Sequence, residues 1–365
     1  MNPAARLPIA LLLLTACGSE LEAAPSSSSQ ALINGAVCAA DEAPTAVALL
    51  FQGRRTVDNV TLDLAVLRCS ASLIAPDVVL TAAHCLDVIG YENLGMFVTR
   101  QSDLTAYVDD NPAQPVALPD DAIGVVHFVA DPEFLRDTNE EGLEHDIALL
   151  FLDRSIDDVR PELVISTREA AVVVEGGTVL LTGWGRQTPA DDAPIAEKRC
   201  GTSTIGRVLP GLIEVGVDLD GTRICRGDSG GPAYLDVETN LGIRRRLIGT
   251  HSRDAGPGTC AGSSFTTRVD AYRAWLDETM SQACDEDIRV WCDVPGLIPA
   301  SFYEPGAAEG EGEGEGEGEG EGDNEDDLNN ESCAATPMSA SLSMLLVAAV
   351  LARTKTTKTK KTTKQ

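Results

Sequence analysis

Short apolar segments, separated by Gly, Pro and Asp, recur through the middle of the chain. Examples are Ala46–Phe51, Leu62–Leu67, Val78–Thr81, Ile123–Val129, Ile147–Leu152, Val172–Val174, Thr178–Thr182 and Arg246–Gly249. Segments of this length bounded by turn-forming residues predict β-strands, and their spacing favours an all-β barrel or sandwich over alternating strands and helices. The stretch Val269–Ala283 differs, because its apolar residues fall near helical spacing. The pattern therefore predicts an all-β body with one late helix.

The N-terminal residues 1–17 have the layout of an export signal. A single base, Arg6, precedes the apolar run Leu7–Leu14, which is too short to span a bilayer but suits the core of a signal peptide. The sequence Leu14-Thr15-Ala16-Cys17 resembles a bacterial lipobox, which implies a lipid on Cys17 and attachment to the outer membrane. An ordinary signal peptide cleaved slightly later, with Cys17 discarded, is the alternative. Residues 18–31 are then a flexible tether or a propeptide.

The C-terminal end differs from the body in composition. Residues 284–303 form a short extension with two cysteines, and residues 304–332 form an acidic linker whose seven Glu-Gly repeats favour an extended chain. In residues 333–365, Cys333 precedes an apolar segment and a basic Thr/Lys tail, a layout that resembles bacterial sorting tags and implies a processing enzyme as partner. A plain membrane anchor and a soluble low-complexity tail are the alternatives, since Met338–Ala352 is shorter than the ~20 residues of a usual span.

Composition and charge narrow the class of protein. With 43% hydrophobic residues the chain can build a substantial core, which excludes general disorder. Its 57 acidic and 28 basic residues give a net charge of −29, which argues against nucleic acid as a partner. Thirteen of the acids lie in residues 304–331 and six of the bases in residues 353–365, which leaves −22 for residues 1–303. Ten cysteines suggest an oxidising compartment.

Three motifs in the body point to one chemistry. They are Thr81-Ala82-Ala83-His84-Cys85, His145-Asp146-Ile147-Ala148-Leu149-Leu150 and Cys225-Arg226-Gly227-Asp228-Ser229-Gly230-Gly231-Pro232. A serine hydroxyl is a poor nucleophile unless an imidazole takes its proton, and the imidazole needs a carboxylate to hold its tautomer and stabilise its charged form. Glycines beside the serine let backbone N–H groups point at the developing oxyanion. The motifs therefore indicate nucleophilic catalysis by a serine.

Together these motifs resemble the chymotrypsin/trypsin family of serine peptidases, from about Leu32 to Trp275, and Gly183-Trp184-Gly185 matches a further marker of that family. The resemblance implies an all-β domain over residues 32–283, built from two packed six-stranded antiparallel β-barrels with a C-terminal helix, and no cofactor or metal.

The chain order of the three motifs is also that of the family. The resemblance implies that His84 is the general base and acid, Asp146 the orienting carboxylate and Ser229 the nucleophile. The N–H groups of Gly227 and Ser229 would form the oxyanion hole. The other histidines carry no such context: His127 and His251 are expected in strands, and His145 merely precedes the acid.

The resemblance also implies a set of disulfides. Cys69–Cys85 matches the bridge beside the catalytic histidine, and Cys225–Cys260 the bridge that braces the specificity pocket. Cys38–Cys200 matches a bridge between the N-terminal segment and the second barrel. Cys284 and Cys292 remain as a local pair outside the family pattern. Each closed loop restricts the unfolded state.

One departure from the family concerns activation. Members insert a new N-terminus, usually Ile-Val-Gly-Gly, against the acid before the nucleophile; here the matching residues are Leu32-Ile33-Asn34-Gly35 and Asp228. The preceding residue is Ala31, so a trypsin-type activator is not indicated. Because residues 18–31 contain no cysteine, cleavage there would activate the enzyme and release it from a lipid on Cys17.

A second departure concerns the specificity pocket. Arg223 stands where trypsin-like members carry the aspartate that binds basic side chains, and a cation there would repel Lys or Arg. Ser252, Arg253 and Asp254 match the substrate-pairing Ser-Trp-Gly strand, and Ser264 a pocket-lining glycine. Arg223 either selects acidic or polar residues, or pairs with Asp254 and leaves a small neutral pocket, or points away. In each case cleavage after Lys or Arg is not favoured.

The sequence therefore predicts an exported serine endopeptidase that acts on protein or peptide substrates at the cell surface, or outside the cell after release. The first alternative is a catalytically silent homologue that serves as a surface binding protein. The second alternative is a membrane-linked structural protein whose tail is the functional part.

Overall fold

The computed structural model describes residues 32–57, 60–87, 92–107, 117–135, 144–186, 196–218, 220–255 and 260–307. The predictions for the export signal, for Cys17, for the Glu-Gly repeats and for the segment from Cys333 onward lie outside these ranges. Across the described ranges, no helix has the length and apolar character needed to cross a membrane.

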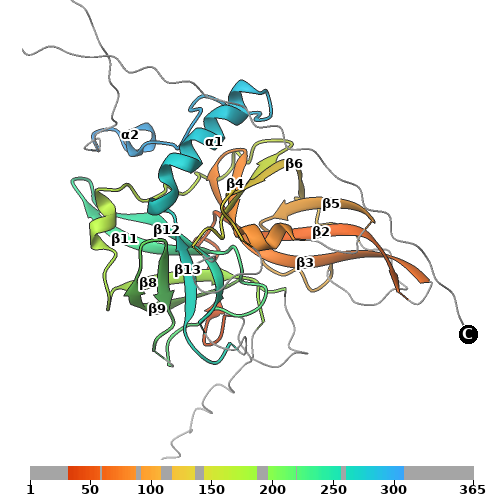
Figure 1. Ribbon diagram of the computed structural model, residues 1–365, viewed down its shortest axis with the longest axis horizontal. Coiled ribbons are helices and arrows are strands. Elements are labelled where there is room, and N and C mark those ends of the chain that lie inside the picture. Colours follow the sequence, from red (N-terminus) through yellow and green to blue (C-terminus); the bar gives the residue numbers. More distant parts are fainter. Residues whose placement is uncertain are drawn as a thin grey trace, which may run out of the picture. The chain divides into compact units, whose positions relative to one another are not determined.

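The first β-barrel closes through six strands in the order β2-β3-β4-β7-β6-β5, all antiparallel (Figure 1). Alternate residues of these strands, such as Val47, Leu49 and Phe51, fill its interior together with Leu150 and Leu152. The strands are β2 (Ala46–Val57), β3 (Val60–Ala75), β4 (Val78–Thr81), β5 (Glu92–Thr99), β6 (Ile123–Ala130) and β7 (Ala148–Leu152), with a 3₁₀ turn η1 (Ala83–Leu86) after β4. Successive side chains of a strand point to opposite faces. One strand can therefore contribute residues to the barrel interior and, on its other face, to a second hydrophobic core.

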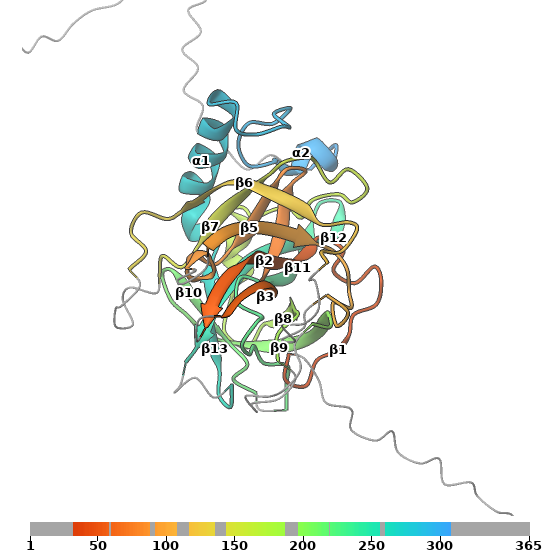
Figure 2. The same cartoon turned by 90° about the vertical axis from the view of Figure 1, so that its right-hand side faces the viewer.

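The second barrel has the order β8-β9-β10-β13-β12-β11 and closes where β11 pairs with β8. Its strands are β8 (Thr178–Gly183), β9 (Arg199–Val208), β10 (Leu212–Val215), β11 (Pro232–Thr239), β12 (Gly242–Asp254) and β13 (Ser264–Arg268); the short β1 (Ala36–Val37) pairs with β9. Figures 1 and 2 show the two barrels side by side. The predicted fold, two six-stranded antiparallel barrels, is confirmed.

The helical prediction is confirmed and one strand prediction is wrong. A 3₁₀ turn η4 (Asp270–Tyr272) leads into α1 (Arg273–Asp285), which buries Leu276 and Met280 and extends two residues beyond the predicted end. Val172–Val174 is not a strand, because the 3₁₀ turn η3 (Glu169–Val172) occupies its start. Val172 and Val174 are 45% and 52% exposed, so the run is a surface turn and has no strand neighbour to pair with.

The extension after α1 folds back onto the first barrel. Arg289 Nη2 lies 2.8 Å from Asp77 Oδ1, and both side chains are fully buried. The N–H groups of Val290 and Trp291 donate to the other oxygen of Asp77, at 2.9 and 2.8 Å. Asp77 stands in the turn between β3 and β4, so the extension supplies four donors to a carboxylate that the barrel itself leaves without a partner charge.

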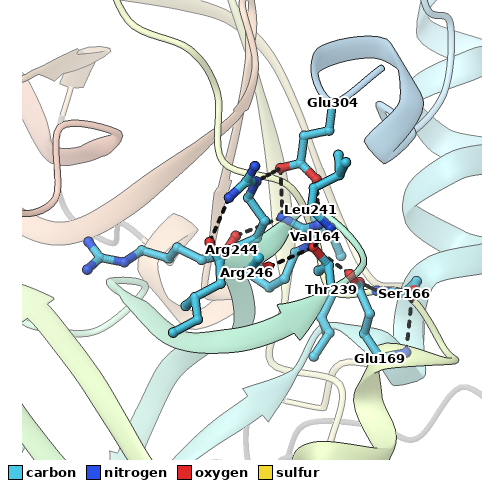
Figure 3. Close-up of polar contacts among 12 residues, drawn as sticks. Val164, Ser166, Glu169, Thr239, Leu241, Arg244, Arg246 and Glu304 are labelled. Carbon is cyan, nitrogen blue, oxygen red and sulfur yellow. Dashed lines mark hydrogen bonds and ion pairs between the residues drawn. The ribbon is translucent and has the colours of Figure 1, made fainter. Parts of the chain in front are cut away.

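The end of the extension binds the second barrel in the same way. After α2 (Ala300–Tyr303), Glu304 accepts hydrogen bonds from Arg246 of β12 at 3.1 and 2.9 Å and from Arg160 at 3.0 Å (Figure 3). Arg246 Nε donates to Glu169, which is held in a reciprocal N-terminal cap with Ser166. Glu304 is 5% exposed, so its assignment to the linker is wrong and the folded body continues to Ala307. The sequence shows only an acid beside Pro and Gly; the arginines that bury it lie far away in the chain.

Replacing Glu304 by Gln should lower the free energy of unfolding by about 3 kcal/mol, because it leaves the buried guanidinium of Arg246 without its main opposite charge. Urea unfolding of the purified protein, followed by circular dichroism, measures the change. Glu238→Gln is the matched control, since Glu238 is exposed on the neighbouring β11 and its loss should cost within about 0.5 kcal/mol. Equal effects of the two substitutions would contradict the prediction.

Candidate active site

The predicted acid and base meet at the junction of the two barrels. His84 lies in η1, directly after β4, and Asp146 lies just before β7. His84 Nδ1 is 2.7 Å from Asp146 Oδ2, and the His84 N–H donates to Asp146 Oδ1 at 2.9 Å. Because the carboxylate accepts at Nδ1, the proton of the neutral ring belongs on Nδ1 and the lone pair on Nε2. His84 is therefore arranged as a proton acceptor.

The carboxylate of Asp146 is 2% exposed and held from both barrels. Ser252 of β12 donates to its Oδ2 at 2.5 Å, and Thr267 of β13 donates to its backbone carbonyl at 3.1 Å. Burial raises the pKa of Asp146, but the charge of His84 and the hydrogen bonds from His84 and Ser252 outweigh this and lower the pKa below its usual range. The carboxyl group is therefore ionised at neutral pH.

The loop of residues 225–232, which carries Ser229 and is called the nucleophile loop after the predicted role of that residue, is tied to the first barrel beside His84. The Ser229 carbonyl accepts from the Ser70 N–H at 2.8 Å, and the Ser70 hydroxyl donates to the Gly227 carbonyl at 3.0 Å. Ser70 follows Cys69, whose disulfide with Cys85 is adjacent to His84 in the chain. Within the described part of the chain, Ser229 Oγ forms no hydrogen bond, and this includes a hydrogen bond to His84 Nε2. Hydrogen bonds between a serine and a histidine of this kind commonly tighten only when substrate binds.

Backbone conformation at Gly227 shapes the loop before the serine. Gly227 has φ +97°, and a Cβ there would lie 2.8 Å from the Gly185 Cα, so no larger residue fits. The Asp228 N–H closes a turn onto the Cys225 carbonyl. Among described residues, none accepts a hydrogen bond from the N–H groups of Gly227 and Ser229, so both amides are available to an oxyanion.

Asp228, next to Ser229, is completely buried, and no described residue supplies an opposite charge to it. Asp228 accepts from the N–H groups of Gly185 at 2.8 Å and Cys225 at 2.9 Å. Burial raises its pKa to about 7, which these two hydrogen bonds only partly offset. Leu32 is also fully buried, and Ile33 pairs with Arg223, five residues before Asp228. The segment around Leu32 thus enters the body close in structure to this loop.

The pocket residues take different roles from one another. Arg223 Nη1 donates to the Ala261 carbonyl at 2.6 Å, and its buried Nε has no partner. Asp254 accepts from the Cys260 N–H at 3.0 Å and from Ser264 Oγ at 3.4 Å. Among the described contacts, Arg223 and Asp254 thus have different hydrogen-bond partners and form no ion pair with each other. Arg253 continues β12 beside Ser252.

The four disulfides of the described residues are the expected pairs: Cys38–Cys200, Cys69–Cys85, Cys225–Cys260 and Cys284–Cys292. Cys284 lies in the last turn of α1 and not beyond it. Disulfides of this number indicate an oxidising compartment, hence an exported protein. Groups with the spacing of metal ligands in the described ranges, Cys69-His84-Cys85 and Cys38-Glu42-Cys200, contain these bridges, so they offer no thiolate.

A cavity of about 640 Å³ lies away from these residues. Its walls come from the Leu163–Val172 segment, the turn between β11 and β12, and the extension near Pro299. β11 begins at Pro232, next to the Ser229 loop, and ends at Thr239 on the cavity wall, which is ~23 Å of strand. The cavity is therefore separate from the triad.

Two histidines have surroundings that the sequence did not indicate. His145 lies between the carboxylates of Asp131 and Glu133. His251, in β12 as predicted, is fully buried under the nucleophile loop: its N–H donates to the Gly231 carbonyl and its carbonyl accepts from the Gly230 N–H. Burial lowers the pKa of His251 to about 3, which the Thr182 backbone only partly offsets. The side chain is therefore neutral in the folded protein.

The sequence is similar to those of known proteins. The family described as Trypsin matches residues 32–276. The chain belongs to the trypsin family.

It is similar to the vitellin-degrading protease of Bombyx mori, at 25% identity over 268 residues that cover 68% of this chain and 86% of the relative. Kallikrein-8 of Mus musculus is 25% identical over 263 residues, with the same coverages of 68% and 86%. Coagulation factor XII of Sus scrofa is 26% identical over 299 residues, 76% of this chain but 44% of the relative. Membership of the trypsin family, together with these protease relatives, supports a serine endopeptidase.

Acid should destabilise this trypsin-family protein through His251. The unfolded chain takes up a proton at His251 near pH 6.5, whereas the folded chain does not until about pH 3, so stability is complete above pH 6.5 and falls as the pH drops from 6.5 towards 3. His251→Val should flatten this fall by up to about 1.4 kcal/mol per pH unit. Urea unfolding of Ser229→Ala protein between pH 4 and 7 measures it. His127→Val, at an exposed strand position, is the control; an unchanged slope in His251→Val would refute the assignment.

Proposed function

We propose that the protein is an exported serine endopeptidase that hydrolyses peptide bonds through the triad His84, Asp146 and Ser229. The observation that carries the proposal is the 2.7 Å contact of His84 Nδ1 with a buried, doubly anchored carboxylate. A carboxylate in that position fixes the tautomer of the base and stabilises its protonated form. No cofactor is needed for this chemistry.

In this mechanism Ser229 Oγ attacks the carbonyl carbon of the substrate while His84 Nε2 takes its proton. The N–H groups of Gly227 and Ser229 donate to the oxyanion of the tetrahedral intermediate. His84 then gives the proton to the leaving amine, and the acyl group remains on Ser229. Water, deprotonated by His84, hydrolyses this ester, which releases the acid and restores the serine hydroxyl.

A fluorophosphonate probe should label the protein at Ser229, and Ser229→Ala should abolish both labelling and hydrolysis. We expect kcat to fall about 10⁶-fold for Ser229→Ala and about 10⁴-fold for Asp146→Asn, because the asparagine favours the wrong tautomer of His84. Mass spectrometry of the probe adduct and hydrolysis of a peptide library are the measurements. A protein that binds peptides but is never labelled would instead be the catalytically silent homologue.

The substrate pocket supports a preference against basic residues. By the family resemblance, Arg223 takes the position at the bottom of the specificity pocket. Asp254 accepts hydrogen bonds from Cys260 and Ser264 and not from Arg223. No described acid forms an ion pair with this guanidinium. Its positive charge therefore repels Lys and Arg and favours acidic or polar side chains of the substrate. The contact with Ala261 anchors that charge in place.

Cleavage of a peptide library should therefore be weak after Lys and Arg. Arg223→Ser should raise kcat/KM for Lys and Arg relative to Glu by about tenfold, since a charge repulsion of about 1.4 kcal/mol is removed. Arg154→Ser removes the same charge from an exposed site and should leave the ratio unchanged. A library profile dominated by basic residues in the unaltered protein would contradict the proposal.

The state of Asp228 supports the proposal that the enzyme is activated by cleavage before Leu32. In the uncut chain its carboxyl is buried with a pKa of about 7 and no described cation beside it. A new ammonium group at Leu32 would supply the missing charge and favour the ionised form. The same cut would separate the body from Cys17, so activation and release from an N-terminal lipid would be one event.

Terminal sequencing of the probe-labelled species should show Leu32 as the first residue, in the fraction that is free of membranes. Asp228→Asn should still be cut but be labelled at least tenfold more slowly, because the ion pair cannot form. Asp218→Asn, at an exposed acid, serves as the control. Finding a labelled, fully active species that begins at Cys17 would overturn this part of the proposal.

A further inference from the structure

The cavity of about 640 Å³ is built from three separate parts of the chain. Its walls come from residues 163–172, from the turn between β11 and β12, and from residues 298–301 of the extension. The extension lies beyond residues 32–276, which the trypsin family matches, so the family fold alone does not supply this wall. A cavity of this size accommodates a small organic molecule.

Much of the cavity wall is aliphatic. Leu163, Val237 and Ile298 line the cavity from buried positions, and Val172 lines it from a position that is 45% exposed. Their side chains carry no hydrogen-bond donor or acceptor, so polar groups of a ligand placed against them would lose their water without a replacement partner. An aliphatic group has no such cost and gains from leaving water. We call these four side chains the aliphatic wall.

Several polar side chains of the cavity are already bound to one another. Arg246 Nε donates to Glu169 at 3.0 Å, and Figure 3 shows both residues with Ser166 in the network around Glu304. The Thr239 hydroxyl donates to a carbonyl of its own turn at 2.7 Å. Since these groups have partners within the protein, they hold the wall in place and leave ligand recognition to other residues.

Two guanidinium groups that line the cavity, those of Arg168 and Arg273, form no ion pair with a described acid. Arg273 Nη1 donates to the carbonyls of Val164 and Ile165 at 3.1 and 2.9 Å, which fixes this side chain against the wall. Burial lowers the pKa of Arg273, and the charges of nearby acids only partly offset this. A partly buried guanidinium remains protonated and has further N–H donors, so it favours an anionic partner.

The charge of the cavity differs from that of the body around it. Three arginines and two glutamates line the cavity, an excess of one positive charge, whereas residues 1–303 carry a net charge of −22. Glu169 is paired with Arg246, and Glu238 is exposed. The cavity therefore combines an aliphatic wall with a local positive charge in an acidic protein.

We propose that this cavity is a binding site for a fatty acid. Its carboxylate binds Arg273 and Arg168, and its alkyl chain covers the aliphatic wall. A peptide is a poorer match, because its amide groups need hydrogen-bond partners that the aliphatic wall does not offer. The site does not depend on the proposed triad, since no residue is shared between the two.

Isothermal titration calorimetry of the purified full-length protein, with decanoate at neutral pH below its micelle concentration, tests the site. We expect one decanoate per chain. Acetate and decylammonium should each bind at least tenfold more weakly, because acetate lacks the alkyl chain and decylammonium lacks the anion. Arg273→Gln should weaken decanoate binding at least tenfold. Arg154→Gln, at an exposed arginine outside the cavity, should leave it unchanged.

Val172→Asp and Val174→Asp form a matched pair that keeps the test valid even if Arg273→Gln does not fold. The two valines are 45% and 52% exposed on one surface turn, but Val172 lines the cavity and Val174 does not. An aspartate at position 172 should weaken decanoate binding at least tenfold, and one at position 174 less than twofold.

Equal effects of the two aspartates, or decylammonium binding as tightly as decanoate, would rule out the site. So would many weak decanoate sites per chain, which indicate binding to the surface in general. Each readout is binding and not hydrolysis, so failure here leaves the peptidase proposal unaffected, and an inactive protein could still bind decanoate.

Discussion

The buried carboxylate of Asp146 joins the two barrels, and the geometry of the site depends on it. Its oxygens accept from His84 on the first barrel and from Ser252 on the second, while Thr267 holds its carbonyl. A buried carboxylate without donors costs several kcal/mol, so the position of the barrels and the ionised state of Asp146 require each other. The base is oriented by the same contacts that assemble the fold.

Ionisable groups inside the body fall into two kinds. Arg289 with Asp77 and Arg246 with Glu304 are paired, and each pair fastens the C-terminal extension to one barrel. Asp228 and His251 are buried with no opposite charge among the described residues, and both border the nucleophile loop. Buried groups with shifted pKa values are common at functional sites, where stability is given up for a required arrangement. The two buried ion pairs stabilise the barrels, and this stability offsets the cost of burying Asp228 and His251.

Local pattern was enough for most of the fold. Apolar runs between turn residues predicted strands such as β4 and β7, because those runs are buried along their whole length and no other element of that size fits them. The motifs around His84, Asp146 and Ser229 predicted the chemistry, since such catalysis requires these residue types in local contexts that survive in sequence. The three disulfides implied by the family resemblance, and the remaining local pair Cys284–Cys292, are the bridges observed.

Contacts between distant segments were beyond the reach of the sequence. Glu304 reads as the start of an acidic linker until Arg246 and Arg160 meet it, and His145 reads as a bystander until Asp131 and Glu133 flank it. Val172–Val174 has strand composition but no neighbour to pair with. The sequence by itself thus indicated most of the strands, the late helix and the family of serine peptidases, because these depend on local order. Only the tertiary structure decided which charges are buried, paired or left alone, because that depends on which segments meet.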